Sequence, residues 1–178
     1  SYVNFLEVRK EIRYLELADT VRSKSLQLRR HEKNFFLYGD SKEINEVHTY
    51  LRDLKTILEQ GRKSYNTEKF LGLENKIDEY SLRFSRIEVI YRDFLKEFTW
   101  LKPLRKEYSS FFPLIESTFL ERPLVNAELI EKIFSLNLSS PVIAGLRELN
   151  DEISSLRKNG EEILTLSKDL DKSAREKA

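Results

Sequence analysis

Apolar residues recur at alternating steps of four and three from residue 73 to residue 101, and no proline interrupts them. A repeat of this period places the side chains on one side of an α-helix, in the pattern of left-handed bundle packing. Because many of these residues are aromatic, the segment predicts a long buried helix in a thick bundle and not in a two-stranded coil. The repeat consists of Leu73, Ile77, Tyr80, Phe84, Ile87, Tyr91, Phe94, Phe98 and Leu101.

Helical patterns also occupy the chain on both sides of this segment. A long helix is expected over residues 2–38, where the apolar stripe changes phase after Leu15, and the Gly39-Asp40 pair is expected to turn the chain. A second, shorter helix follows and ends near Gly61. A last long helix begins at Pro141, with Ser140 as its N-cap.

The four prolines all lie between residues 103 and 141. Proline breaks helices, so this stretch predicts short helices over 104–120 and 127–136, the second one capped by Asn126. No strand pattern occurs. The sequence therefore predicts an all-α fold, an elongated antiparallel bundle of about six helices with long first, third and last members. We expect one helical-bundle domain over residues 1–178, with the proline-containing insertion at about 103–141.

The composition excludes several classes of function. Lys and Arg number 31 against 30 Asp and Glu, a net charge of +1, so we expect no nucleic-acid partner. The absence of cysteine excludes disulfides and thiolate chemistry. No run of apolar residues is long enough to span a membrane. Both ends read as helix interior, and we expect a fragment of a longer protein whose transmembrane helices lie outside it.

Signatures of catalysis are missing from the sequence. It contains no P-loop, no dinucleotide-binding glycine pattern, no nucleophile elbow and no HExxH motif, so we expect no enzyme activity, no catalytic residue and no cofactor in this fragment. The two histidines, His31 and His48, are too few for a metal site, which needs three or four ligands. For both we expect hydrogen-bonded packing in preference to metal binding or pH sensing.

Arginines gather at the level of His31 in the expected bundle, and two interpretations are open. Converging guanidinium groups can hold a carboxylate ligand in bidentate fashion. Alternatively, the arginines pair with acidic neighbours on a solvated face, which is the commoner outcome for surface charges. The arginines are Arg29, Arg30, Arg52, Arg83 and Arg86, and the acidic candidates are Glu32, Glu79, Glu88 and Asp151.

The stretch from Arg29 to Asp40 reads RRHEKNFFLYGD. It resembles the RR-x-EK-x-F-L-x-x-D segment of bacterial extracytoplasmic sensor domains, the helical bimodular and four-helix modules of chemoreceptors and sensor histidine kinases. The resemblance implies a periplasmic domain of an inner-membrane receptor that senses a small organic anion. It also implies that arginines hold this anion, and the candidate ligand-binding residues are Arg29, Arg30, His31, Arg83 and Arg86.

Two classes of function follow from the sequence. The first is the sensor domain of a membrane-anchored receptor, most readily a two-component histidine kinase, which forms a homodimer through its first and last helices. The apolar stripes expected at that interface are Phe5, Val8, Ile12 and Leu15 on the first helix, with Ile163 and Leu170 on the last. The second class is a cytoplasmic helical scaffold that binds other proteins through its long helices.

Overall fold

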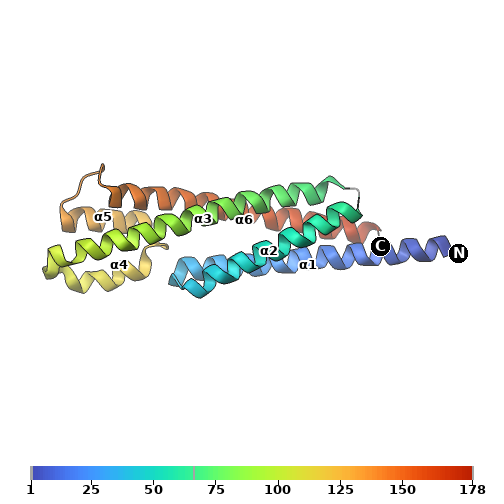
Figure 1. Cartoon of the computed structure of the whole chain (residues 1–178), viewed down its shortest axis with the longest axis horizontal. Coiled ribbons are helices and arrows are strands. Elements are labelled where there is room, and N and C mark those ends of the chain that lie inside the picture. The colour runs from blue at the N-terminus through green and yellow to red at the C-terminus, as the bar shows by residue number, and fades with distance from the viewer. Residues whose placement is uncertain (1, 66, 178) are drawn as a thin grey trace. The chain divides into compact units, whose positions relative to one another are not determined.

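A computed structural model describes the backbone of residues 2–65 and 67–177 (Figure 1). The described residues form six α-helices and one 3₁₀-helix, and no strand occurs among them. The helices are α1 (Tyr2–Tyr38), α2 (Ser41–Ser64), α3 (Glu68–Leu101), the 3₁₀-helix η1 (Lys102–Phe111), α4 (Phe112–Thr118), α5 (Pro123–Phe134) and α6 (Pro141–Lys177). The all-α prediction is confirmed, and so are the long helices α1, α3 and α6, which contain 37, 34 and 37 residues.

The turn between α1 and α2 depends on Gly39. This residue has a φ of +63°, and its N–H donates to the carbonyl of Phe35 at 2.7 Å, which closes the end of α1. A Cβ atom at position 39 would lie 2.7 Å from the hydroxyl of Tyr91. Glycine is therefore required here both by the left-handed backbone and by the space available.

The proline-containing stretch differs from the prediction in two places. The segment predicted as one helix over 104–120 is instead η1 followed by α4, with Arg105 at φ −138° and ψ 61° inside the 3₁₀ segment. Asn126 is not an N-cap, because α5 begins earlier, at Pro123. Proline favours the first helical position, which explains the start at Pro123. Asn126 lies buried inside the helix, and its side-chain amide donates to the carbonyl and hydroxyl oxygens of Thr118 at 2.9 and 3.0 Å.

Contacts divide the chain into two compact units. The first consists of residues 1–32, 42–81 and 158–178, and the second of residues 33–41 and 82–157. The helices α1, α3 and α6 each contribute residues to both units. None of the helices within the described residues combines the length and the apolar composition of a bilayer-spanning helix.

In the first unit, α6 alternates large and small buried residues along its inner face. Gly160, Ile163, Ser167, Leu170 and Ala174 are all almost inaccessible to solvent. The burial of Ile163 and Leu170 corrects the expectation that the end of the last helix offers an apolar stripe to a second molecule. That stripe is already covered by this chain.

The amino-terminal part of α1 is different, because its apolar residues face solvent. Phe5, Val8 and Ile12 are 58%, 50% and 48% exposed, and Leu6 is 46% exposed. The first buried core residue of α1 is Tyr14, whose ring packs against Tyr65 with the centroids 4.8 Å apart. Within the first unit, the amino end of α1 and the carboxyl end of α6 lie at the same end of the bundle (Figure 1).

The second unit is built around aromatic rings. Phe98 on α3 contacts Phe112 and Phe119 edge to face, with the ring centroids 5.5 and 5.2 Å apart. Phe94, one turn earlier, meets Phe119 at 4.1 Å. The aromatic part of the four-three repeat in α3 therefore packs against the short helices of the proline-containing stretch.

Candidate functional site

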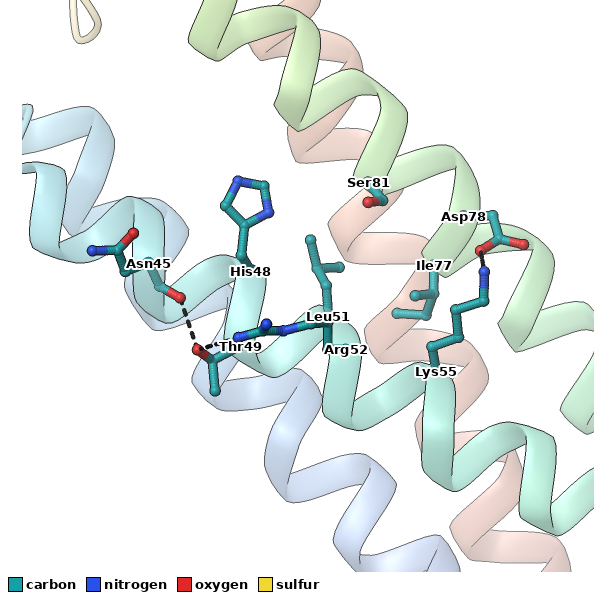
Figure 2. Close-up of a pocket in the computed structure, with 9 residues that line it drawn as sticks. All are labelled: Asn45, His48, Thr49, Leu51, Arg52, Lys55, Ile77, Asp78 and Ser81. Atoms are coloured by element: carbon teal, nitrogen blue, oxygen red, sulfur yellow. Dashed lines mark hydrogen bonds and ion pairs between the residues drawn. The ribbon is translucent and has the colours of Figure 1, made fainter.

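Three basic residues share one face of α2. His48, Arg52 and Lys55 follow one another at steps of four and three, so a regular helix points their side chains in similar directions. They line a groove of about 540 Å³ between α2 and α3 in the first unit (Figure 2). The other lining residues are Asn45, Thr49 and Leu51 from α2 and Ile77, Asp78 and Ser81 from α3.

The floor of this α2–α3 groove is apolar. Leu51 and Ile77 are 4% and 1% exposed, because both belong to the buried faces of their helices. The polar side chains stand around this floor. An apolar base with a few polar groups above it is the usual composition of a small-molecule site.

Arg52 is the most available cation of the groove. Its side chain is exposed, and it runs along α2 toward Thr49, whose hydroxyl accepts a hydrogen bond from Nη2 at 3.4 Å (Figure 2). Thr49 in turn donates to the carbonyl of Asn45 at 2.9 Å. Among the described residues Arg52 forms no ion pair with a carboxylate. Its guanidinium group therefore keeps four of its five N–H donors for a ligand.

Lys55 reaches across the groove to α3, where its Nζ lies 3.0 Å from Oδ1 of Asp78 (Figure 2). The hydrogen bond to Asp78, together with the charge of that carboxylate, raises the pKa of Lys55 above 10.5. Lys55 thus stays protonated, and Asp78 is the single acidic residue among those that line the groove. With Arg52 and Lys55 against Asp78, the lining carries a net positive charge before His48 is counted.

Arg29, the first of the residues that the sequence resemblance pointed to, is held by a buried carboxylate. Its Nη1 donates to the two oxygens of Glu32 at 2.8 and 2.7 Å, and the hydroxyl of Tyr80 donates to Oε1 of Glu32 at 2.7 Å. Glu32 is 2% exposed and Tyr80 is fully buried. Burial, followed by the charge of Glu32, raises the pKa of Tyr80 well above 10. Arg29 therefore pairs with Glu32, one of the partners that the pairing interpretation named, but this carboxylate is buried and does not lie on a solvated face.

The side chain of His31 also makes contacts inside the first unit. Its Nδ1 hydrogen-bonds Oε2 of Glu43 at 2.5 Å, its Nε2 lies 3.8 Å from Oε2 of Glu46, and its ring stacks on Tyr50. The hydrogen-bonded packing that we expected for His31 is confirmed. His48 lines the α2–α3 groove, and for this residue the expected hydrogen-bonded packing stays a prediction. No cluster of three or more potential metal ligands occurs in the part of the chain that the structure describes.

The other predicted residues are not among those that line the α2–α3 groove. Arg30 is exposed on α1. In the second unit, Nη1 of Arg83 lies 3.9 Å from Glu152, and Nε of Arg86 donates to Glu148 at 2.9 Å. The five predicted residues are thus divided between the units, three in the first and two in the second, and their role in ligand binding stays a prediction.

Sequence reasoning weighed Arg52 among the arginines that could hold a carboxylate, but it named none of His48, Arg52 and Lys55 as candidate ligand-binding residues. It counted Arg52 among the arginines and assigned His48 to packing, but it did not consider Lys55. The signal was nevertheless present, since His48, Arg52 and Lys55 stand at helical steps on a segment with a regular apolar stripe on its other side. Comparisons of the chain with known protein families, with curated proteins and with solved structures find no match.

Proposed function

We propose that this chain is the extracytoplasmic, ligand-binding domain of a membrane-anchored signalling receptor, of the two-component histidine-kinase kind, and that the α2–α3 groove binds its ligand. The observation that carries the proposal is the exposed Arg52 guanidinium, which has no carboxylate partner among the described residues, beside Lys55 and His48 over an apolar floor. The resemblance of the segment from Arg29 to Asp40 to sensor domains supports the same class of function.

The chemistry of the groove favours a small organic acid. A ligand carboxylate can accept two parallel hydrogen bonds from Arg52, a geometry that an ammonium group cannot offer. Lys55 can exchange part of its contact with Asp78 for the ligand, and Asn45 and Ser81, which also line the groove, add neutral polar groups. The short carbon skeleton of the acid would cover Leu51 and Ile77.

Two features of the fold support the proposal that this chain belongs to a receptor. The two helical units formed around shared long helices agree with a bimodular sensor domain. The amino end of α1 and the carboxyl end of α6 lie on the same side of the first unit, as a domain inserted between two transmembrane helices requires (Figure 1). In this arrangement the first unit lies next to the bilayer.

A homodimer belongs to the proposal. Phe5, Val8 and Ile12 form an exposed apolar stripe on α1, and a second copy of the chain would remove this stripe from water. Because the inner face of α6 is covered within the chain, the interface involves α1 more than α6. The alternative function, a cytoplasmic scaffold, would use the same exposed residues to bind a different protein.

A thermal-shift screen of small mono- and dicarboxylic acids tests the ligand class. An acid present at a hundred times its Kd should stabilise the native state by about 2.7 kcal/mol through mass action. The shift should disappear in Arg52→Gln and persist in Arg30→Gln, a matched loss of one exposed arginine on α1. If stabilising acids act equally on both variants, or if none is found, the α2–α3 groove is not the ligand site. A shift lost only in Arg83→Gln or Arg86→Gln would assign the ligand to the second unit.

A further inference from the structure

A second basic groove lies at the amino end of α1, in the first unit. Leu6, Arg9, Lys10 and Arg13 line it from α1, Ser64 lines it as the last residue of α2, and Tyr65 follows directly after that helix. Its volume is about 380 Å³. Because residues three, four and seven apart lie on one face of a helix, the four α1 residues form a continuous wall. We call it the terminal basic groove.

The cations of this groove are not neutralised by the chain. Among the described residues, Arg9, Lys10 and Arg13 take part in no ion pair. Glu7 and Glu16 lie three residues from Lys10 and Arg13 along α1, yet neither forms an ion pair with them. Three positive charges thus stand together without a carboxylate partner, in a molecule whose net charge is only +1.

Tyr65 gives the groove a fixed aromatic wall. Its ring packs between Tyr14 and Phe70, with centroid separations of 4.8 and 6.1 Å, and the Nζ of Lys10 lies 5.8 Å above it. Burial raises the pKa of Tyr65, so its hydroxyl keeps its proton at neutral pH. That hydroxyl donates only a long hydrogen bond, 3.3 Å, to the carbonyl of Lys10. It is therefore available to a stronger acceptor, as is the hydroxyl of Ser64.

We propose that the terminal basic groove binds a phosphate group, and that the headgroup of an anionic phospholipid supplies it. Three cations and two hydroxyl donors around one small groove match the charge and the acceptor oxygens of a phosphate. The exposed Phe5 and Leu6 lie beside the cations, and apolar residues next to basic ones and a tyrosine are the composition of a protein surface that contacts a charged bilayer.

This inference goes beyond the proposed ligand site and does not depend on it, because the two grooves share no residue. It assigns the amino end of α1 to the membrane surface by its own chemistry. An anchored receptor would then hold its first unit against the lipid headgroups through the same helix that carries the apolar stripe.

Co-sedimentation with vesicles tests the proposal. The chain should bind vesicles that contain phosphatidylglycerol in phosphatidylcholine, and it should not bind vesicles of phosphatidylcholine alone. Arg9→Gln/Arg13→Gln should weaken this binding roughly thirtyfold, because each basic residue near an anionic surface contributes separately. The matched control is Lys158→Gln/Lys168→Gln, which removes two exposed charges from α6 and should bind as the unaltered chain does. All the substituted side chains are exposed, and melting curves of both variants check that they fold.

Equal binding to both kinds of vesicle, equal weakening in both variants, or no binding at all would overturn the lipid assignment. A parallel arm with inorganic phosphate separates the two sources of the anion. If phosphate raises the melting temperature of the chain but not of Arg9→Gln/Arg13→Gln, while vesicles are not bound, the groove takes a soluble phosphate and the lipid assignment is wrong. Loss of organic-acid binding in Arg52→Gln has no bearing on this result.

Discussion

At the scale of single residues, the buried carboxylate of Glu32 determines the role of Arg29 in the segment from Arg29 to Asp40. Glu32 is 2% exposed, and its negative charge is compensated by Arg29 and by the hydroxyl of Tyr80. Removing one partner from a buried ion pair leaves the other charge without compensation, which costs far more than the loss of a surface pair. The pairing of Arg29 is therefore a structural requirement of the first unit.

The structural role of Arg29 predicts different effects of substituting Arg29 and its neighbour Arg30. Arg29→Gln should lower the free energy of unfolding by about 3 kcal/mol, because the buried Glu32 would lose the cation that Arg29 supplies. Arg30→Gln, which alters an exposed side chain, should change it by less than about 0.5 kcal/mol. Urea denaturation at neutral pH measures both. Equal stability of the two variants would contradict the role given to the Arg29–Glu32 pair.

The sequence predicts only in part which residues form the α2–α3 groove. The spacing of His48, Arg52 and Lys55 places them on one face of α2, and that much is readable from the sequence. The sequence does not state that this face meets α3 at the level of Asp78, because the pairing of two helices depends on packing over their whole length. The same reason explains why the sequence left the pairing of Arg29 with Glu32 open, since Tyr80, which donates to Glu32 and helps to bury it, is distant in sequence.

At the scale of helices, periodicity predicted the regular elements well. The bounds of α1 and the start of α6 agree with the sequence patterns because Gly39 and Pro141 mark them and long apolar stripes run between. The stretch around η1 and α4 was harder to predict. With prolines at 103 and 113, several short helical forms satisfy the local rules, and the choice among them depends on the aromatic packing of Phe112 and Phe119 with α3.

Four helical glycines provide a prediction about packing between elements. A Cβ atom at Gly61 would lie 2.4 Å from the ring of Phe70, and one at Gly160 would lie 2.3 Å from Nη1 of Arg29, whereas Gly72 and Gly145 have open space. Gly72→Ala and Gly145→Ala should therefore stabilise the chain by up to about 1 kcal/mol through helix propensity.

Gly61→Ala and Gly160→Ala should instead destabilise it by about 1–3 kcal/mol, because the neighbouring side chains are confined. Thermal denaturation followed by circular dichroism at the helix band compares the four variants. Stabilisation by alanine at all four positions would mean that α2 and α6 do not pack as closely as described.

At the scale of the whole molecule, the exposed stripe on α1 predicts a parallel pairing of two copies of the chain. The chain contains no cysteine, so single cysteines report cleanly on proximity. In the full-length protein, which we propose to be a receptor, Val8→Cys and Ile12→Cys should form disulfide-linked dimers under mild oxidation, since disulfides need Cα atoms within about 7 Å of each other. Lys10→Cys, on the side of the terminal basic groove, should crosslink far less. Similar crosslinking at all three positions would remove the basis for this interface.

The contact between Arg29 and Gly160 has a mechanical consequence. A Cβ atom at Gly160 would lie 2.3 Å from Nη1 of Arg29, so α6 passes this arginine at a residue without a side chain. Moving α6 along α1 by one helical turn would bring Leu156 or Leu164 to that place, because residues four apart lie on one face of a helix. Arg29 would then have to move, and its hydrogen bonds to the buried Glu32 would be disturbed. A change of register between the two helices is therefore coupled to the charge compensation of Glu32.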